Sequence, residues 1–194
     1  MARPRGSYAK GIAKREEILD TALEIVARDG YSRATVRELA QAVGLSQTGL
    51  LHYFGSKEQL FIEILRRRDA VDFQVVSGEG ALPVDLERAL TDLQRHNAEV
   101  PGLVQLFSRL SAEAVEPDHP AHAYFRDRYR EARTSGAEAV RERQAAGDLP
   151  EGIDADRLAV LLFALIDGLQ MQWQYDPEID MAEHLSYFWS LLGR

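Results

Sequence analysis

A pair of histidines separated by two residues is the first place in this sequence where metal chemistry could occur. His119 and His122 stand in the segment DHPAH, with Glu116 and Asp118 close by. Imidazole nitrogens and carboxylate oxygens are ligands that zinc accepts. Histidines beside a proline at the start of a helix are commonly solvated instead, and we favour that interpretation. We therefore predict no bound metal.

Asp167 is the second candidate, because it interrupts the longest apolar run, residues 158–166. A carboxylate buried in an apolar helix must be paired or hydrogen-bonded. It could face a ligand, a partner helix or a structural partner, and we favour the structural role. The sequence contains no glycine-rich phosphate loop and no nucleophile elbow. We therefore predict no catalytic residue, no enzyme activity and no cofactor; a small helical enzyme that uses Asp167 and the histidines is the alternative.

The helices that would position functional side chains are clearest in residues 35–60, TVRELAQAVGLSQTGLLHYFGSKEQL. Thr35 and Glu38 predict a capping box, in which the hydroxyl accepts from the third helical amide and the carboxylate accepts from the cap amide. Gly44 supplies the left-handed residue that commonly ends a helix. The segment therefore begins with a short capped helix and a tight turn.

A second short helix follows the turn. Ser46 can cap its start, Gly55 ends it, and Ser56 with Gln59 predicts another capping box that opens a third helix at Lys57. Two short helices joined by a tight turn are the layout of a helix-turn-helix DNA reader, whose second helix enters the major groove. Capped short helices occur in any helical protein, but three caps at this spacing favour the helix-turn-helix.

Composition limits the class of protein. With 194 residues and 45% hydrophobic content, the chain can form one large or two small helical domains with a sizeable core. It has no cysteine, which excludes disulfides and thiolate metal sites. The first residues are basic and polar without an apolar signal segment, and the longest apolar run is far shorter than the ~20 residues of a membrane span. We expect a soluble, cytoplasmic protein.

The net charge of −8 is distributed unevenly along the chain. Residues 1–68 contain 12 Lys and Arg against 8 Asp and Glu, a net charge of +4. Residues 69–194 contain 11 against 23, a net charge of −12. Such asymmetry suggests different partners for the two parts. The basic part would meet phosphate, and the acidic part would be repelled by DNA.

The pattern of helices and breaks predicts an all-α chain of about nine helices, since no segment alternates like a strand. We expect four parts: a basic flexible arm at 1–11, a three-helix helix-turn-helix DNA-binding domain at 12–56 with the motif at 35–54, a connecting helix at 57–75, and a larger helical domain at 76–194. The arm could add phosphate or minor-groove contacts. An arm without any role is the alternative.

The last two helices are expected to form a dimer interface. The helix capped by Asp154 has the body LAVLLFALIDGLQMQW, which is apolar nearly all round and so requires cover on several sides. Asp180 caps the final helix, where Leu185, Phe188 and Leu192 share a face. A second subunit is the simplest cover, and two helices from each chain would make a four-helix interface. A monomer with a thick core is the alternative.

Three segments resemble the tetracycline-repressor (TetR) family of bacterial transcription regulators. The segment REEILDTALEIVARDGY is similar to the family's first helix, TVRELAQAVGLS to its second helix and turn, and TGLLHYFGSKEQLF to its recognition helix and the start of its fourth helix. The resemblance covers residues 14–65, and some subfamilies also share residues 166–169. It implies an all-α homodimer whose N-terminal domains bind a palindromic operator and whose C-terminal domains bind a small molecule and dimerise.

The resemblance further implies a repressor that a ligand releases from DNA, because ligand and operator would each weaken the other's binding. An activator or global regulator on the same fold is one alternative, and a dimeric interaction module without DNA binding is another. The effector is a small molecule of unknown identity. Its expected contacts, some of which could equally be core residues, are Phe107, Leu110, Asp167, Gln170, Met171 and Trp173.

The resemblance places Gln47, Thr48 and Gly49 at the exposed start of the recognition helix, where family members contact base edges. A glutamine amide can pair bidentately with adenine. Lys57, at the start of a helix, suits a phosphate. The full set of expected DNA contacts is Thr35, Arg37, Ser46, Gln47, Thr48, Gly49, His52, Tyr53 and Lys57.

One position departs from the family pattern. Leu51 stands where most members have a tyrosine, so a phosphate contact from this position is lost or becomes apolar. Tyr53 is the expected substitute, and His52 is the second candidate. An operator known for another member therefore should not be transferred to this chain.

Overall fold

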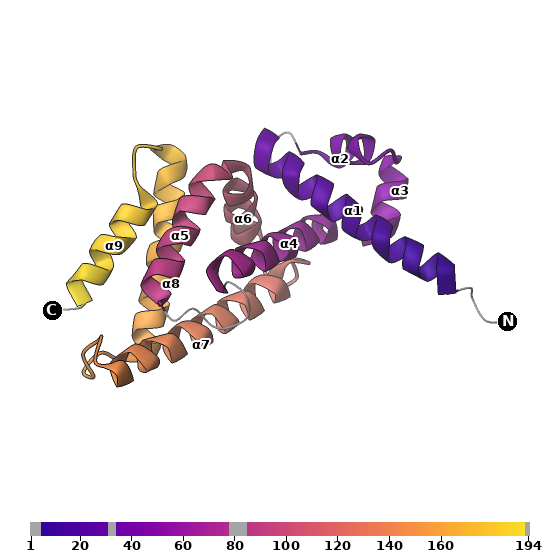
Figure 1. Ribbon diagram of the computed structural model, residues 1–194. Coiled ribbons are helices and arrows are strands. Elements are labelled where there is room, and N and C mark those ends of the chain that lie inside the picture. The colour runs from indigo at the N-terminus through magenta and orange to yellow at the C-terminus, as the bar shows by residue number, and fades with distance from the viewer. Residues whose placement is uncertain (1–4, 31–33, 78–84, 193–194) are drawn as a thin grey trace. The chain divides into compact units, whose positions relative to one another are not determined.

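The computed structural model describes the backbone of residues 5–30, 34–77 and 85–192. Within these ranges the chain forms nine α-helices and no strand (Figure 1). The all-α prediction is confirmed. No helix in the described ranges has both the length and the apolar character of a membrane span.

Packing divides the chain into two compact units, residues 1–71 with 100–121 and residues 72–99 with 122–194. The first unit contains α1 (Arg5–Asp29), α2 (Val36–Ala42), α3 (Gln47–Phe54), α6 (Pro101–Glu113) and most of α4 (Lys57–Ser77). The second contains α5 (Leu86–Glu99), α7 (His122–Ala146), α8 (Ala155–Tyr175) and α9 (Met181–Leu192). The functional boundaries expected from the sequence stay a prediction, since packing units and functional domains need not coincide.

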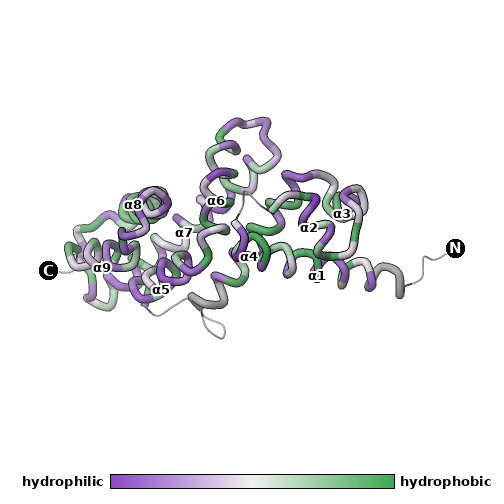
Figure 2. The backbone as a smooth tube through the Cα atoms, turned by 90° about the horizontal axis from the view of Figure 1, so that it is seen from above, coloured by the Kyte–Doolittle hydropathy of each residue, from purple (hydrophilic) through white to green (hydrophobic). Residues whose placement is uncertain are grey.

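The core of the first unit forms where α1 meets the helix-turn-helix and α4. Ile18, Ala22 and Val26 lie on one face of α1 at helical spacing and are fully buried. Figure 2 shows hydrophobic and hydrophilic residues alternating along the tube of α1, as this one-sided burial requires. The facing residues, also buried, come from α2, α3 and α4: Leu39, Ala40, Leu50, Phe54, Leu60, Ile64 and Leu65.

Helix α1 begins earlier than the sequence analysis predicted. It starts at Arg5, so residues 5–11, which we expected to belong to a flexible arm, are helical, whereas residues 1–4 lie outside the described part of the chain. Gly6 and Gly11 fall inside the helix, and each costs only about 1 kcal/mol relative to alanine. No proline follows Pro4 until residue 83, so nothing in the sequence prevents the helix from extending this far.

Helix α6 belongs to the first unit because it packs directly on α1. A β-carbon placed on Gly102 would lie 1.9 Å from the carbonyl oxygen of Val26 and 2.7 Å from the α-carbon of Gly30. Both contacts are to backbone atoms, which cannot move aside cheaply. Only glycine fits at residue 102, and its lack of a side chain lets the two backbones touch.

The second unit is built around α8, which packs on α7 and α9, while α5 packs on α9. One face of α8 is buried and carries Leu158, Leu162, Ile166 and Leu169. The Tyr129 hydroxyl of α7 donates to the Asp167 carboxylate of α8 at 2.7 Å. Asp167 therefore has a structural hydrogen-bond partner, the role favoured from the sequence.

The opposite face of α8 is apolar but exposed. Leu161, Ala164, Gly168, Met171 and Tyr175 follow one another at spacings of three and four residues, and so share this face. Leu161 is 62% and Tyr175 is 85% exposed. On α9, Tyr187 and Leu191 are likewise exposed. We call these seven residues the apolar surface.

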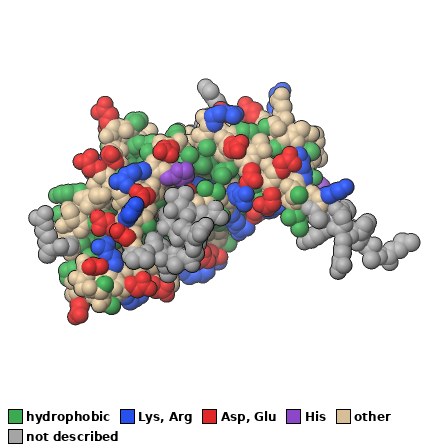
Figure 3. Space-filling view, in the orientation of Figure 1, with side chains coloured by type: hydrophobic (Ala, Val, Ile, Leu, Met, Phe, Trp, Pro, Cys, Tyr) green, Lys and Arg blue, Asp and Glu red, His purple; other side chains and the backbone are tan. Residues whose placement is uncertain are grey.

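Charged side chains are frequent on the face drawn in Figure 3. On the face in view, Figure 3 shows acidic and basic side chains intermixed, with hydrophobic side chains between them. Many of the basic groups pair with carboxylates of their own helix, as Arg95 does with Asp92 and Arg130 with Asp127. Exposed pairs of this kind contribute little stability. They mark a solvated surface, in contrast to the apolar surface of α8 and α9.

Candidate nucleic-acid interface

A capping box fixes the start of α2. The hydroxyl of Thr35 accepts from the Glu38 amide at 3.2 Å, and the Glu38 carboxylate accepts from the Thr35 amide at 3.0 Å. These reciprocal bonds satisfy two backbone donors that would otherwise lack partners at the helix end. The predicted box is confirmed.

The turn and the limits of α3 also have the predicted geometry. Gly44 has a φ of 69° and Gly55 a φ of 85°, both in the left-handed region that favours glycine. The Ser46 hydroxyl accepts from the Gly49 amide at 3.0 Å and caps α3. Lys14 of α1 donates to the Val43 carbonyl at 3.3 Å, which ties the turn to the first helix.

Helix α4 starts with half of its predicted capping box. The Ser56 hydroxyl accepts from the Gln59 amide at 3.1 Å, while the Gln59 side chain donates to Glu63. Lys57 is exposed at this helix start, with its ammonium nitrogen 5.8 Å from the centre of the buried Phe61 ring. The ring face attracts the cation and holds it near the N-terminus of α4.

Glu63 joins α4 to α1. Its carboxylate accepts from Arg15 at 2.7 Å and from Arg66 at 2.8 Å. Burial by itself raises the pKa of Glu63, but the hydrogen bond and charge of Arg15, with the charge of Arg66, lower it below its ordinary value of 4.5. Glu63 is therefore ionised and links α4 to α1, the two helices that pack against the helix-turn-helix.

The start of α3 presents its polar side chains to solvent. Gln47 and Thr48 are exposed, whereas Leu50 is buried against the core. At the other end His52 is exposed and Tyr53 is half-buried, with their rings in edge contact at 6.5 Å. Three of the predicted DNA contacts on α3, Gln47, Thr48 and His52, are thus exposed, and their roles remain predictions.

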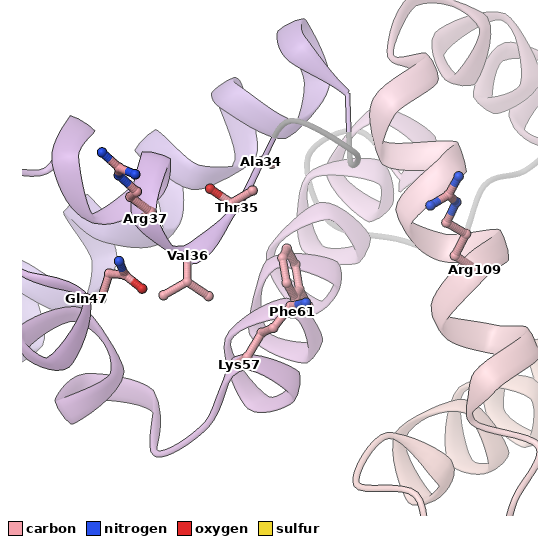
Figure 4. Close-up of a pocket in the computed structure, with 8 residues that line it drawn as sticks. All are labelled: Ala34, Thr35, Val36, Arg37, Gln47, Lys57, Phe61 and Arg109. Atoms are coloured by element: carbon pink, nitrogen blue, oxygen red, sulfur yellow. The ribbon is translucent and has the colours of Figure 1, made fainter.

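Four of the predicted DNA contacts line one open groove of about 560 Å³ (Figure 4). They are Thr35, Arg37, Gln47 and Lys57, and Arg109 of α6 lines it with them. We call this the basic groove. The other three lining residues are apolar: Ala34, Val36 and Phe61. None of the eight lining residues is therefore a carboxylate. Three positive charges gather here in a protein whose net charge is −8.

Arg109 was missed by the sequence analysis. It is an isolated basic residue in the middle of a helix, with no motif around it. It reaches the basic groove because Gly102 seats α6 on α1. Such a long-range approach leaves no local signal, so the sequence could not have revealed it.

A second groove, of about 460 Å³, is lined by side chains of both charges. Its charged lining residues are Arg28, Asp29 and Glu38, with Ile25, Gln41 and Ala42 completing it. Arg28 is paired with Asp29 at 2.7 Å. We call this the mixed groove. Glu38 and Arg37 are neighbours on α2, so the two sides of this short helix differ in charge.

The six predicted effector contacts fall into both units. Phe107 and Leu110 are buried in the first unit, where the Arg68 guanidinium carbon lies 5.4 Å from the centre of the Phe107 ring. The other four lie on α8 in the second unit: Asp167, Gln170, Met171 and Trp173. Met171 is on the apolar surface, whereas Gln170 is buried. Their common role in a pocket remains a prediction.

The histidine segment has a structural role. The Nδ1 atom of His119 accepts from the Ala121 amide at 3.1 Å, just before α7 begins. In the described ranges, no group of three or more His, Asp or Glu side chains lies close enough together to hold a metal ion.

Helix α5 contains polar groups that the sequence analysis did not single out. Gln94 is completely buried, and within the described residues neither atom of its amide has a hydrogen-bond partner. Thr91, one turn earlier, is 4% exposed, and its hydroxyl likewise lacks a partner there. A buried polar group without a partner costs about 1–3 kcal/mol. Such groups in a native protein commonly meet water or a ligand.

Known proteins resemble this chain along most of its length. The family described as bacterial regulatory proteins, tetR family, matches residues 18–64, and the family described as BetI-type transcriptional repressor, C-terminal, matches residues 85–186. The HTH-type transcriptional repressor AcnR of Corynebacterium diphtheriae is 31% identical over 176 residues, which cover 89% of this chain and 87% of that protein.

Two solved structures are similar in fold. A TetR transcriptional regulator from Chloroflexus aurantiacus is 26% identical with a TM-score of 0.72, covering 94% of this chain and 95% of that one. A transcriptional regulator from Saccharomonospora viridis in complex with choline is 27% identical with a TM-score of 0.66, covering 92% and 93%. Together with the capped helix-turn-helix, these similarities identify the chain as a member of the tetR family of bacterial regulatory proteins and as a DNA-binding transcriptional repressor.

Proposed function

We propose that the protein represses transcription as a homodimer bound to a palindromic operator, and that a small molecule releases it. The observation that carries the proposal is the basic groove, which brings Arg37 and Lys57 beside Gln47 at the start of the recognition helix. Cations beside an exposed helix start suit a phosphate backbone next to a major groove. The protein would act in the cytoplasm, as a regulator and not as an enzyme.

Each expected contact has a distinct chemical role. Gln47 would read a base, since its amide can both donate to and accept from adenine. Thr48 would offer a hydroxyl or a methyl group to a neighbouring base. Lys57 and Arg37 would neutralise phosphates, which sets affinity without choosing sequence. Contacts to the sugar-phosphate backbone are expected from the remaining residues: Thr35, Ser46, Gly49, His52 and Tyr53.

The apolar surface supports the dimer. Large side chains such as Leu161, Tyr187 and Leu191 are each more than 60% exposed, although apolar groups gain free energy when they leave water. Ala164 and Gly168 are small and would let a partner helix approach closely. An isologous pairing of α8 and α9 with a second copy would bury these residues on both chains. It would also supply two recognition helices for half-sites about 34–36 Å apart.

The second unit would hold the effector. Among the residues that the structure describes, the buried polar atoms of Gln94 and Thr91 have no hydrogen-bond partner. Asp167, Gln170 and Trp173 lie on α8 of the same unit. The similar regulator from Saccharomonospora viridis, which is in complex with choline, supports a small organic effector. If effector and operator favour different conformations of the dimer, each must weaken the other's binding by the same factor.

The proposal is tested by two variants of the recognition surface and a pool of randomised duplexes. Lys57→Ala should weaken binding to every duplex and reduce the salt dependence, because it removes a phosphate contact. Gln47→Ala should instead relax selection at one base position of each half-site. If the two variants change selection and salt dependence in the same way, the assigned roles are wrong.

A further inference from the structure

The basic groove extends beyond the helix-turn-helix. Arg37 lies on α2 and Lys57 on α4, but Arg109 comes from α6, far along the chain. Figure 4 shows Arg109 on its own helix, across from the side chains of Lys57 and Phe61. Arg109 is exposed, so a ligand in the groove could reach its guanidinium.

The helix that carries Arg109 packs directly on α1. Gly102 and Arg109 are seven residues apart, two helical turns, and therefore lie on nearly the same side of α6. At Gly102 the backbones of α6 and α1 are in contact, with no space for a β-carbon. The close contact two turns away positions the part of the α6 backbone from which Arg109 projects.

The charge of the groove favours an anionic partner. The lining has three cationic side chains and no carboxylate, whereas the mixed groove on α2 has two carboxylates and one arginine. The basic groove is open and continuous with Gln47 and Lys57, the proposed base and phosphate contacts. A DNA strand that contacts Lys57 would therefore bring a further phosphate to the same groove.

We propose that Arg109 binds a backbone phosphate of the operator, so that α6 contacts DNA together with the helix-turn-helix. The inference rests on the proposed function and deepens it. The BetI-type C-terminal family matches residues 85–186, a range that includes α6. Part of the segment shared with that C-terminal family would thus contact DNA directly. A guanidinium is suited to this role because its planar donors match phosphate oxygens.

The test measures binding of the full-length protein to a short duplex of scrambled sequence, between about 50 and 200 mM salt. Arg109→Gln should lower the salt slope by about one per protomer, since one phosphate contact is lost. Arg109→Lys should retain most of the slope. Arg28→Gln is the matched control, because it removes the same charge from the mixed groove of the same unit, and it should leave the slope unchanged.

Two results would overturn the inference. The first is a salt slope for Arg109→Gln equal to that of the unchanged protein, although Lys57→Ala lowers the slope. That result would remove Arg109 from the DNA contacts and leave the proposed function intact. The second is a groove that binds free anions and not DNA. In that case inorganic phosphate would raise the melting temperature of the unchanged protein but not of Arg109→Gln, and the two proteins would have the same salt slope for DNA binding. If the unchanged protein fails to bind any duplex, the proposed function fails with it.

Discussion

Gly102 of α6 lies against Val26 of α1 so closely that a methyl group on its α-carbon would be 1.9 Å from the Val26 carbonyl oxygen. This contact places a helix from residues 101–113 beside the DNA-binding helices. It is the packing relationship on which the position of Arg109, and therefore the extent of the basic groove, depends.

Gly102→Ala is expected to destabilise the protein by about 2 kcal/mol or more, because the added methyl group forces two backbones apart. Urea unfolding of both proteins measures the difference. Gly11→Ala is the matched control: Gly11 is also helical and in the same unit, but apart from the adjacent backbone of its own helix no described atom lies within 4 Å of a β-carbon there. The control should be neutral or slightly stabilising. Equal effects of the two substitutions would contradict the close contact.

Replacing Glu63 should cause a pH-dependent loss of stability. The pKa of Glu63 is lowered in the folded protein, so the unfolded chain holds this proton more tightly. The stabilisation is therefore present above the ordinary value of 4.5 and is lost as the pH falls through the lowered pKa. Glu63→Gln should cost about 1–2 kcal/mol at neutral pH.

Thermal unfolding over a pH series measures this effect. The difference between Glu63→Gln and the unchanged protein should shrink as the pH falls below 4.5. A difference that stays constant across the series would show that the charge of Glu63 is not what stabilises the contact between α1 and α4.

Gln94→Met is expected to stabilise the protein by about 1–2 kcal/mol, because it nearly preserves the volume and removes a buried amide that has no partner in the described part of the chain. Gln144→Met is the control in the same unit. The Gln144 amide donates to the carbonyls of Pro150 and Ile153, so its loss should be destabilising. Urea unfolding after extensive dialysis compares them. If Gln94→Met destabilises as Gln144→Met does, the Gln94 amide has a partner in solution.

Leu161→Glu should convert the proposed dimer to a monomer, since it would place one buried charge from each chain at the proposed symmetric interface. Light scattering coupled to size-exclusion chromatography would show the mass falling from that of two chains to that of one. Val115→Glu is the control, because Val115 is 71% exposed but lies in the first unit. If the unchanged protein already has the mass of a single chain, the proposed dimer is wrong.

The sequence predicted the helix-turn-helix well because its signals are local. The caps at Thr35 and Ser46 and the left-handed glycines at 44 and 55 each involve residues within one turn, so their spacing in the chain determines their geometry. The cap at Asp154 was predicted for the same reason. Family resemblance then added the roles that no local pattern can supply.

Features that depend on distant packing were missed. Nothing near Arg109 in the sequence indicates that α6 lies on α1, and nothing near Gln94 indicates that its amide is completely buried. The effector role expected for Met171 stays a prediction, but its exposure on α8 was not foreseen, because a helix that is apolar all round does not reveal which face is buried. These positions are decided by which helices meet, and that information is spread over the whole chain.

The central claim is that this chain recognises a specific operator through α3. It is tested most directly by the equilibrium affinity of the full-length protein for the palindromic duplex selected from a random pool, compared with a scrambled duplex of equal length at the same salt. We predict at least about 10³-fold tighter binding to the palindrome, with most of that preference lost in Gln47→Ala. Equal affinity for the two duplexes would contradict the claim.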